Sequence, residues 1–314
     1  MTLALPLFSP DTAGLAQAAG LLAKGGLVAF PTETVYGLGA DARVDTAVAG
    51  IYAAKERPSF NPLIVHVPDV DTARRYAVFT PEAEALAARF WPGPLTLVLP
   101  LRPDAGISAL VTAGLDSVAI RVPAHPVARA LLRAFDGPLA APSATPSGRI
   151  SPTTAAHVVN GLTGRIQGVV DGGACGVGVE STIISLLGHP AMLRAGGLAL
   201  EEVESALGQS LTQQTHAEKP TSPGQMLSHY APVGRLRMDV TAPEADETFI
   251  GFGALGGEYN LSPAGDLVEA AAGLFAMLHK MDAIGAARIA VAPIPEEGLG
   301  RAINDRLRRA AAPR

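Results

Sequence analysis

The sequence from Leu27 to Gly39 is LVAFPTETVYGLG, an apolar run that passes into a turn rich in hydroxyl and glycine residues. The apolar run predicts a strand over 27–30, because short apolar runs bounded by turn residues are typical of buried strands. Gly25-Gly26 ends a helix predicted over 15–22 from its apolar face. A helix, a strand and a polar turn in this order indicate an α/β protein.

Helices and strands continue to alternate after this stretch. Helices are predicted over 45–55, 80–90, 125–134 and after Ser151, and strands over 63–67, 95–99 and 117–122, at Leu139, near Val169, over 182–187 and near Met192. From 208 onward the composition shifts to Gln, Thr, Ser, Pro and His, which is typical of a linker. Strands over 248–252 and 288–294 then flank an amphipathic helix over 266–283. The predicted organisation is an α/β sheet domain over 1–207, a linker over 208–233 and a smaller α/β unit over 234–314.

The bulk composition excludes several classes of protein. The chain has 314 residues, 48% of them hydrophobic and 17% charged, which suits a two-domain enzyme rather than a disordered chain. Its net charge of -5 argues against stable nucleic-acid binding. Cys175 is the only cysteine, which excludes an internal disulfide and a multi-cysteine metal site. With neither a signal-peptide pattern over 1–10 nor a long apolar run, the sequence predicts a cytoplasmic protein without membrane spans.

The turn over 31–39 has two interpretations. Its threonines and glycines could turn hydroxyls and backbone groups toward a ligand. Alternatively, it is an ordinary turn in which Gly37 and Gly39 take positive φ and the threonines satisfy the backbone.

Two cations follow in the segment Lys55-Glu56-Arg57-Pro58, and Asn61 and His66 come shortly after them. Cations at the end of a helix can simply complement its dipole. They can also form part of a site, because Arg57 lies beside a proline-bracketed loop. His66 falls within an apolar strand, where a satisfied core histidine is the commoner outcome.

The strand over 117–122 alternates with period two, which places Ser117, Ala119 and Arg121 on one face. A guanidinium on that face needs an anion, either a protein carboxylate or a ligand carboxylate or phosphate. Arg194 comes at the end of a predicted strand, a usual location for ligand groups in α/β sheets.

The glycines of the sequence do not predict either of the common nucleotide-binding motifs. Gly251, Gly253 and Gly256 match G-x-G-x-x-G, but no helix is predicted directly after them to hold a pyrophosphate, which weakens an oxidoreductase interpretation. The chain also has no G-x-x-x-x-G-K-[ST] motif, so ATP would have to be held by scattered cations and hydroxyls. Cys175 lies in a Gly-rich turn and is expected to be inert.

Taken together, these segments resemble the YrdC-type threonylcarbamoyl-AMP synthase family, in its longer two-domain branch. The resemblance rests on PTETVYGLG, KERP, NPLIVH, the segment 117–122, the Ser143 region, ESTI and LRAG in the first domain. It extends to Ser222-Pro223-Gly224, to HYAP at 229–232 and to the segment 298–310.

This resemblance implies a twisted, open, concave sheet domain that holds ATP and threonine, plus a small Rossmann-like domain. It implies formation of L-threonylcarbamoyl-AMP and pyrophosphate from L-threonine, bicarbonate and ATP, with magnesium, for tRNA modification; a tRNA threonylcarbamoyl transferase would act downstream. The residues it associates with threonine are Thr34, His66, Arg121, Ala141 and Ser181. Those it associates with ATP are Arg57, Asn61, Ser117, Ser143, Ser151, Arg194 and Tyr230, with Lys55 and Arg57 as the charge-neutralising pair. It implies no metal ligands in the protein, and a linker that closes over the cavity as a lid.

One position departs from the family pattern, because Thr145 stands where the family commonly has Asn, so no role is assigned to it. An alternative from another class is an RNA-binding or ribosome-associated module without turnover, which predicts salt-sensitive RNA retention. The acidic net charge argues against it.

Overall fold

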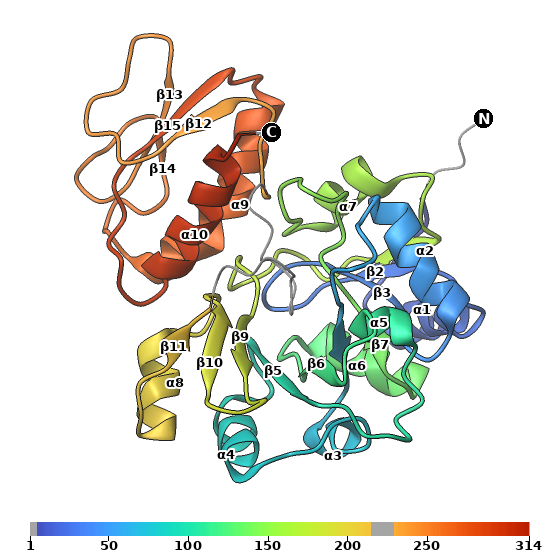
Figure 1. Ribbon diagram of the computed structural model, residues 1–314. Helices are drawn as coiled ribbons and strands as arrows, with labels where there is room; N and C mark the ends of the chain where they lie inside the picture. The colour runs from blue at the N-terminus through green and yellow to red at the C-terminus, as the bar shows by residue number, and fades with distance from the viewer. Residues whose placement is uncertain (1–4, 215–228, 314) are drawn as a thin grey trace.

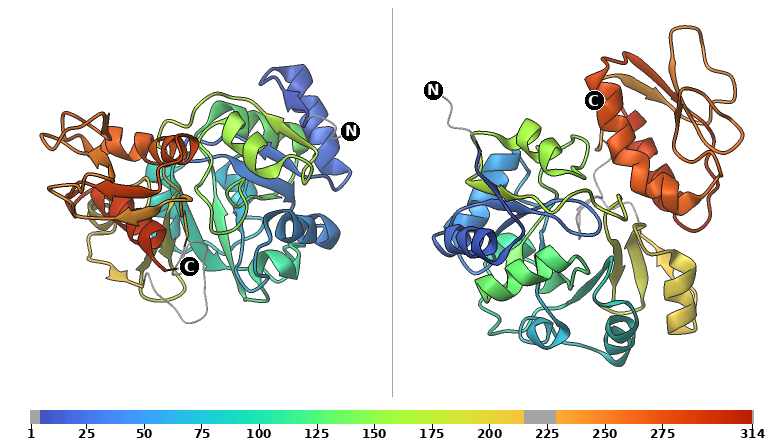
Figure 2. Two further views of the ribbon diagram at one scale, coloured as in Figure 1. Left: turned by 90° about the horizontal axis from the view of Figure 1, so that it is seen from above. Right: turned by 180° about the vertical axis from the view of Figure 1, so that it is seen from behind.

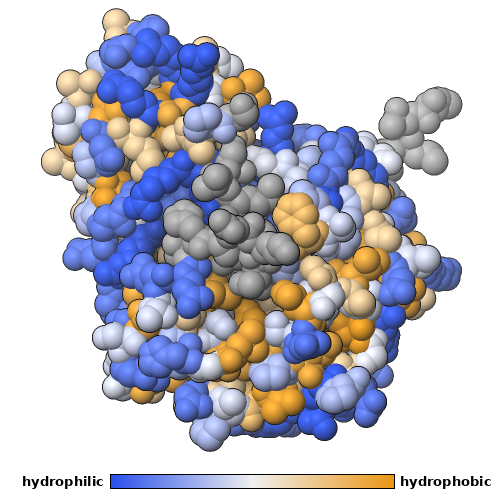
Figure 3. Space-filling view, viewed as in Figure 1, coloured by the Kyte–Doolittle hydropathy of each residue, from blue (hydrophilic) through white to orange (hydrophobic). Residues whose placement is uncertain are grey.

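The computed structural model describes residues 5–214 and 229–313 and contains two units (Figure 1). Over these residues the larger unit has an eleven-stranded mixed sheet, and the smaller unit has a four-stranded parallel sheet. The space-filling view shows the smaller unit as a separate lobe at the upper left (Figure 3). The predicted α/β class and the division into a large and a small unit are confirmed.

The larger unit contains the predicted helices and strands, and also elements over 7–8, 37–41, 70–73, 109–112, 200–207 and 212–213 that were not predicted. Its helices are α1 (Thr12–Ala23), α2 (Asp45–Lys55), α3 (Val70–Ala73), α4 (Pro81–Phe90), α5 (Ala109–Thr112), α6 (Pro126–Phe135), α7 (Ala155–Leu162) and α8 (Leu200–Leu207). Its strands are β1 (Leu7–Phe8), β2 (Val28–Phe30), β3 (Gly37–Asp41), β4 (Ile64–His66), β5 (Leu95–Pro100), β6 (Ser117–Arg121), β7 (Leu139–Ala140), β8 (Gly168–Val170), β9 (Thr182–Ser185), β10 (Ala191–Arg194) and β11 (Thr212–Gln213). The strands lie in the order β1-β8-β2-β3-β7-β4-β6-β5-β9-β10-β11.

Local capping explains where several of these helices begin. The carboxylate of Asp11 accepts from the Gly14 backbone amide at the start of α1. Thr80 caps α4 in the same way, and Pro81 occupies the first turn, where its missing N–H costs nothing. These caps satisfy backbone donors that a helix start leaves unpaired.

The interpretation of Gly37 and Gly39 as positive-φ turn residues is wrong. Both lie in β3, which pairs antiparallel with β2, and neither is among the positive-φ glycines of the described residues. A Cβ at Gly39 would lie 2.9 Å from the Phe30 ring. These glycines are therefore needed for space beside the neighbouring strand rather than for an unusual backbone angle.

The predicted linker begins within the larger sheet, because β11 pairs parallel with β10. Residues 215–228 of this linker, including the quoted Ser222-Pro223-Gly224, lie outside the described residues.

The smaller unit has the strands β12 (Arg235–Arg237), β13 (Thr248–Gly251), β14 (Tyr259–Asn260) and β15 (Arg288–Val291), in the order β12-β15-β13-β14. Its helices are α9 (Leu267–Ala283) and α10 (Gly300–Ala311). After β13 the chain turns into β14, and the next helix begins only at Leu267. The glycines at 251, 253 and 256 therefore do not form a dinucleotide-binding turn.

The two units share a hydrophobic core. Helices α9 and α10 lie on the side of the small sheet that faces the larger unit (Figures 1 and 2). Their buried residues form one cluster with Val35, Ile150, Val179 and Tyr230. Over the described residues, no helix combines the length and the apolarity that crossing a membrane requires.

Gly196 offers a test of how tightly the strand ends around the site are packed. A Cβ there would lie 2.3 Å from the Glu180 carbonyl oxygen, and this contact is with backbone that cannot move away. Gly196→Ala should lower the free energy of unfolding by about 1–3 kcal/mol, as overpacking does. Urea denaturation followed by circular dichroism measures this change.

Gly188→Ala, in the turn between β9 and β10, is the matched control, because a Cβ there meets nothing within 4 Å. Equal stability of the two variants would contradict the predicted overpacking at Gly196.

Candidate active site

One cavity brings together strand ends of the larger unit and two residues that precede the smaller unit. The lining residues are Thr32, Thr34, Val35, Gly37, Arg57, Ile64, His66, Arg121, Ala141, Pro142, Ser143, Glu180, Ser181, Arg194, His229 and Tyr230. Most of the predicted site residues are among them. The cavity is therefore lined by three guanidinium groups together with several hydroxyls.

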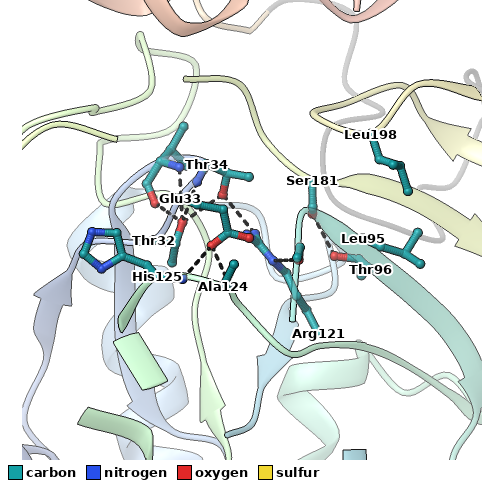
Figure 4. Close-up of polar contacts among 12 residues, drawn as sticks. Thr32, Glu33, Thr34, Leu95, Thr96, Arg121, Ala124, His125, Ser181 and Leu198 are labelled. Carbon is teal, nitrogen blue, oxygen red and sulfur yellow. Dashed lines mark hydrogen bonds and ion pairs between the residues drawn. The ribbon is translucent and has the colours of Figure 1, made fainter. Parts of the chain in front are cut away.

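Arg121 is held at one end of the cavity by the turn that follows β2 (Figure 4). Its Nη2 donates to Glu33 Oε1 at 2.6 Å, and its Nη1 donates to Thr34 Oγ1 at 2.9 Å. The second Glu33 oxygen accepts from the backbone amides of Ala124 and His125. Of the two anions expected for Arg121, the structure supplies a protein carboxylate, and this carboxylate fixes the orientation of the guanidinium.

Thr34 is positioned in turn by its neighbour Thr32. Their Oγ1 atoms lie 2.8 Å apart, and Thr32 Oγ1 donates to the Val35 carbonyl oxygen at 2.6 Å. Both threonines are buried. The hydroxyls of this turn therefore satisfy the backbone and line the cavity at the same time, although Gly37 and Gly39 do not take the positive φ of an ordinary turn.

Ser181 lies at the start of β9, between two polar neighbours. Its Oγ is 2.7 Å from Thr96 Oγ1 and accepts from Arg194 Nη2 at 3.1 Å. Arg194 Nε also donates to the Ser181 carbonyl oxygen at 3.0 Å. Burial lowers the pKa of Arg194 to about 10, so the guanidinium stays charged at neutral pH.

Arg57 approaches the cavity from the loop after α2. Its Nη2 donates to the Pro62 carbonyl oxygen at 3.0 Å, and its Nε donates to the Asn61 carbonyl oxygen at 3.3 Å. Burial of the guanidinium lowers the pKa of Arg57 to about 10, although part of the side chain stays accessible. Arg57 therefore also carries its charge at neutral pH.

Lys55 is predicted from the sequence to neutralise charge together with Arg57, but its side chain does not line the cavity. The side chain is 2% exposed, and its Nζ donates to the backbone carbonyls of Ser143 and Thr145. Burial, with the nearby Arg57 charge, lowers the pKa of Lys55 well below its ordinary value. These contacts tie the loop that carries Ser143 to the end of α2.

His66 lines the cavity as a neutral imidazole. Burial is the main reason that the pKa of His66 falls to about 3, and the Arg121 charge lowers it further. The ring Nδ1 lies 3.3 Å from the Ile64 carbonyl oxygen, and the ring edge packs on Phe30. A neutral ring can donate or accept a hydrogen bond without adding charge to the site.

Four predicted site residues are not among the lining residues: Lys55, Asn61, Ser117 and Ser151. Asn61 is buried, and its Oδ1 has no hydrogen-bond partner within the described part of the chain. Ser117 lies at the end of β6 remote from Arg121, and the Oγ of Ser151 donates to Glu180 Oε1. Lys55 and Ser151 contact residues that line the cavity, through the Ser143 carbonyl oxygen and the Glu180 carboxylate, whereas Ser117 lies farther along its strand.

The structure also reveals site residues that the sequence analysis did not select: Thr32, Glu33, Glu180 and His229. Glu33 and Glu180 each stand beside a predicted hydroxyl residue, in PTET and in ESTI. The sequence signal that could have identified them is a carboxylate next to a hydroxyl residue in a motif predicted to be buried. A buried carboxylate needs a cation or hydrogen-bond donors nearby. Which cation it meets depends on long-range folding.

Comparisons with known proteins agree over the whole chain. The Sua5/YciO/YrdC family model, described as "Telomere recombination", matches residues 20–196, and the model "Threonylcarbamoyl-AMP synthase, C-terminal domain" matches residues 198–312. A Bacillus subtilis protein named threonylcarbamoyl-AMP synthase is 44% identical, over 96% of this chain and 93% of its own. This chain belongs to the threonylcarbamoyl-AMP synthase family.

Archaeal relatives of the family give the same result. A Pyrococcus abyssi protein named threonylcarbamoyl-AMP synthase is 42% identical over 94% of this chain and 93% of its own. The crystal structure of Pyrococcus abyssi Sua5 complexed with L-threonine superposes with a TM-score of 0.89 at 38% identity, covering 98% of this chain and 97% of that chain. The resemblance stated from the sequence motifs is therefore confirmed.

The buried, neutral state of His66 predicts a dependence of stability on pH. The folded-state pKa of about 3 lies below the ordinary value of 6.5, so the unfolded chain takes up a proton first as the pH falls. Above about pH 6.5, His66 is neutral in both the folded and the unfolded chain and does not reduce the free energy of unfolding. As the pH falls from 6.5 toward 3, protonation of the unfolded chain lowers the free energy of unfolding progressively. His66→Gln should therefore gain roughly 2 kcal/mol of stability relative to the parent chain between pH 7.5 and pH 5.

Urea denaturation of both proteins at several pH values measures this difference. A constant difference between the two proteins across this range would show that His66 is not held neutral in the folded state.

Proposed function

We propose that this chain forms L-threonylcarbamoyl-AMP and pyrophosphate from L-threonine, bicarbonate and ATP, for threonylcarbamoyl-adenosine modification of tRNA. The observation that carries the proposal is the convergence of Arg57, Arg121 and Arg194 on one cavity lined with hydroxyls. Carboxylates and phosphates are the ligands that such guanidinium groups bind best. The close relatives named for this activity match this chain over nearly its whole length.

Threonine is proposed to bind at the Arg121 end of the cavity. Arg121 already has its orientation fixed by Glu33 and Thr34, which would let it receive the amino-acid carboxylate with little rearrangement. The other residues proposed here are His66, Ala141 and Ser181. A buried hydroxyl partner for the threonine side chain would discriminate against valine, because an unmatched buried polar group costs about 1–3 kcal/mol.

ATP is proposed to bind next to threonine, toward Arg57 and Arg194, with the Arg194–Ser181 hydrogen bond lying between the two subsites. Ile64 lines the cavity and belongs to a small buried apolar cluster with Val98, Ala119, Ile183 and Leu193. Such a cluster suits the nucleotide base, and the guanidinium groups suit the phosphates. The further residues proposed to contact ATP are Asn61, Ser117, Ser143, Ser151 and Tyr230.

The proposed chemistry needs no covalent enzyme nucleophile. The threonine amine adds to the carbon of bicarbonate, and loss of water gives a carbamate. A carbamate oxygen then attacks the α-phosphorus of ATP, and the bond to pyrophosphate breaks. Catalysis rests on positioning and on cations that stabilise negative charge at the phosphates. Arg57 and Arg194 are the groups proposed for this role. The sequence also predicts Lys55 for it, but the contacts of Lys55 with two backbone carbonyls lead us to propose that it holds the loop carrying Ser143.

Magnesium is proposed to enter as the complex with ATP. Both carboxylates nearest the cavity are engaged, Glu33 by Arg121 and two backbone amides, and Glu180 by Arg306 and Ser151. Over the described residues there is no cluster of three or more His, Cys, Asp or Glu residues that could hold a metal ion. The residues therefore do not fit a resident magnesium ion, and the metal is part of the substrate.

The product carries an activated carbamoyl group, which a transferase must consume before water does. We propose that a tRNA threonylcarbamoyl transferase acts downstream, and that the chain works in the cytoplasm, where ATP and tRNA occur together.

The first test is pyrophosphate release from ATP and magnesium, with threonine or bicarbonate omitted in turn. Release should require both substrates, and mass spectrometry should detect the adenylate. Valine in place of threonine should lower kcat/KM by about tenfold to a hundredfold. Folded protein that retains RNA in low salt but shows no threonine-dependent release would instead support an RNA-binding module.

A second test separates the roles of Arg57 and Lys55. Arg57→Ala should lower kcat/KM for ATP by about a hundredfold or more, because it removes a cation from the phosphates. Lys55→Met should lower the free energy of unfolding by about 1–3 kcal/mol, because it leaves two buried carbonyls without a donor. Steady-state kinetics and urea denaturation of both variants measure these effects.

Lys24→Met, at an exposed lysine, is the control for loss of a lysine charge. If Lys55→Met abolishes turnover at unchanged stability, Lys55 acts on the substrate rather than on the loop.

A further inference from the structure

Arg306 is a fully buried arginine that the smaller unit contributes to the larger one. It lies on α10 and has 0% of its surface exposed. Its Nε donates to Glu180 Oε2 at 3.0 Å, and its Nη1 donates to the Ala195 carbonyl oxygen. Its guanidinium carbon lies 5.5 Å from the centroid of the Tyr230 ring. One side chain therefore contacts three separate segments of the chain.

Each of these segments contributes a residue to the cavity wall. Glu180 and Tyr230 line the cavity themselves, and Ala195 directly follows the lining residue Arg194. Arg306 is not among the lining residues. It therefore lies behind the wall and acts on the cavity through its neighbours.

The contact with Glu180 matters because Glu180 is a carboxylate in a cavity that suits anions. Burial by itself raises the pKa of Glu180, but the Arg306 and Arg194 charges and the Ser151 hydroxyl outweigh it, so the carboxylate stays ionised. Ser151 and Arg306 each take one of its oxygens. Without Arg306, this negative charge would repel phosphates or turn toward the guanidinium groups of the cavity.

Tyr230 is held from the same side. Its backbone has a positive φ of 61°, which is uncommon for a residue with a side chain. The ring packs between Phe275 of α9, at a centroid distance of 5.4 Å, and the Arg306 guanidinium. Both contacts come from the smaller unit, so that unit sets where the Tyr230 ring stands in the cavity wall.

We propose that Arg306 is a positioning residue for nucleotide binding, supplied by the C-terminal unit. It neutralises Glu180 and holds the Tyr230 ring, which keeps the ATP end of the cavity favourable for phosphates. The inference rests on the proposed function, and it makes the C-terminal unit part of the nucleotide site rather than a separate appendage.

Calorimetric titration of the full chain with ATP and magnesium, and separately with threonine, tests the proposal. Arg306→Met should raise the Kd for ATP about tenfold or more, because it removes the arginine that pairs with the Glu180 carboxylate in the cavity wall. The Kd for threonine should stay within about threefold, since the Arg121 end is held by Glu33 and Thr34. Retained threonine binding also shows that the variant is folded.

The double variant Arg306→Met, Glu180→Gln provides the decisive comparison. It removes both charges, so ATP affinity should recover most of the loss seen with Arg306→Met alone. Arg308→Ala is the matched control, because Arg308 lies on the same helix with a side chain that is 55% exposed. It should bind ATP and threonine as the parent chain does.

The proposal is overturned if Arg306→Met binds ATP normally. It is also overturned if ATP and threonine binding are lost together and the double variant restores neither, because Arg306 would then only support the fold. A parent chain that binds neither ATP nor threonine would instead refute the proposed function. If the parent chain turns over ATP and threonine, and Arg306→Met binds ATP as tightly as the parent does, only this inference is refuted.

Discussion

Burying several positive charges around one cavity is the constraint on which the rest of the structure depends. Lys55, Arg121, Arg194 and Arg306 are each at most 5% exposed. A buried cation is tolerated only with an anion or several carbonyls to accept its hydrogen bonds. Each of these residues has such acceptors, and apart from Asp305 beside Arg306 the acceptors cited here lie on a segment remote in sequence or on a neighbouring strand end. Satisfying the cations therefore draws the walls of the cavity together.

The same constraint explains how the two carboxylates at the cavity are used. Glu33 is held by Arg121 and two backbone amides, and Glu180 is held by Arg306 and the Ser151 hydroxyl. Because both carboxylates are paired, the arginines lining the cavity leave it positively charged, which favours anionic substrates. The hydroxyls of Thr34, Ser143 and Ser181 add directional contacts without adding charge. This combination suits a reaction in which two anions must approach one another.

The smaller unit belongs to this arrangement rather than standing beside it. Its core includes Tyr230 and residues of the larger unit, and its helix α10 inserts Arg306 behind the cavity wall. A close approach of Gly178 to the backbone of α9 shows how tightly the units meet, since a Cβ there would lie 2.5 Å from Ala272. A domain attached only by a linker would have no need of such contacts. The cavity proposed to bind the nucleotide and the interface between the two units therefore share residues.

The sequence alone determined most of the longer helices and strands and much of the site's composition, because these depend on local patterns. The alternation over 117–122 placed Arg121 and Ser117 on one face of β6, and the motif residues Thr34, Arg57, Ser143, Ser181 and Arg194 identified the family.

Tertiary structure decided the pairings. Glu33 meets Arg121 across 88 positions and Glu180 meets Arg306 across 126, and no local pattern specifies a partner at such separation. It also decided that Gly37 and Gly39 lie in a strand, since their role depends on Phe30 in the neighbouring strand, and that Lys55 bonds two carbonyls of a distant loop. Spacing along a chain encodes which face a side chain takes, whereas its partner is set only when the strands and units pack.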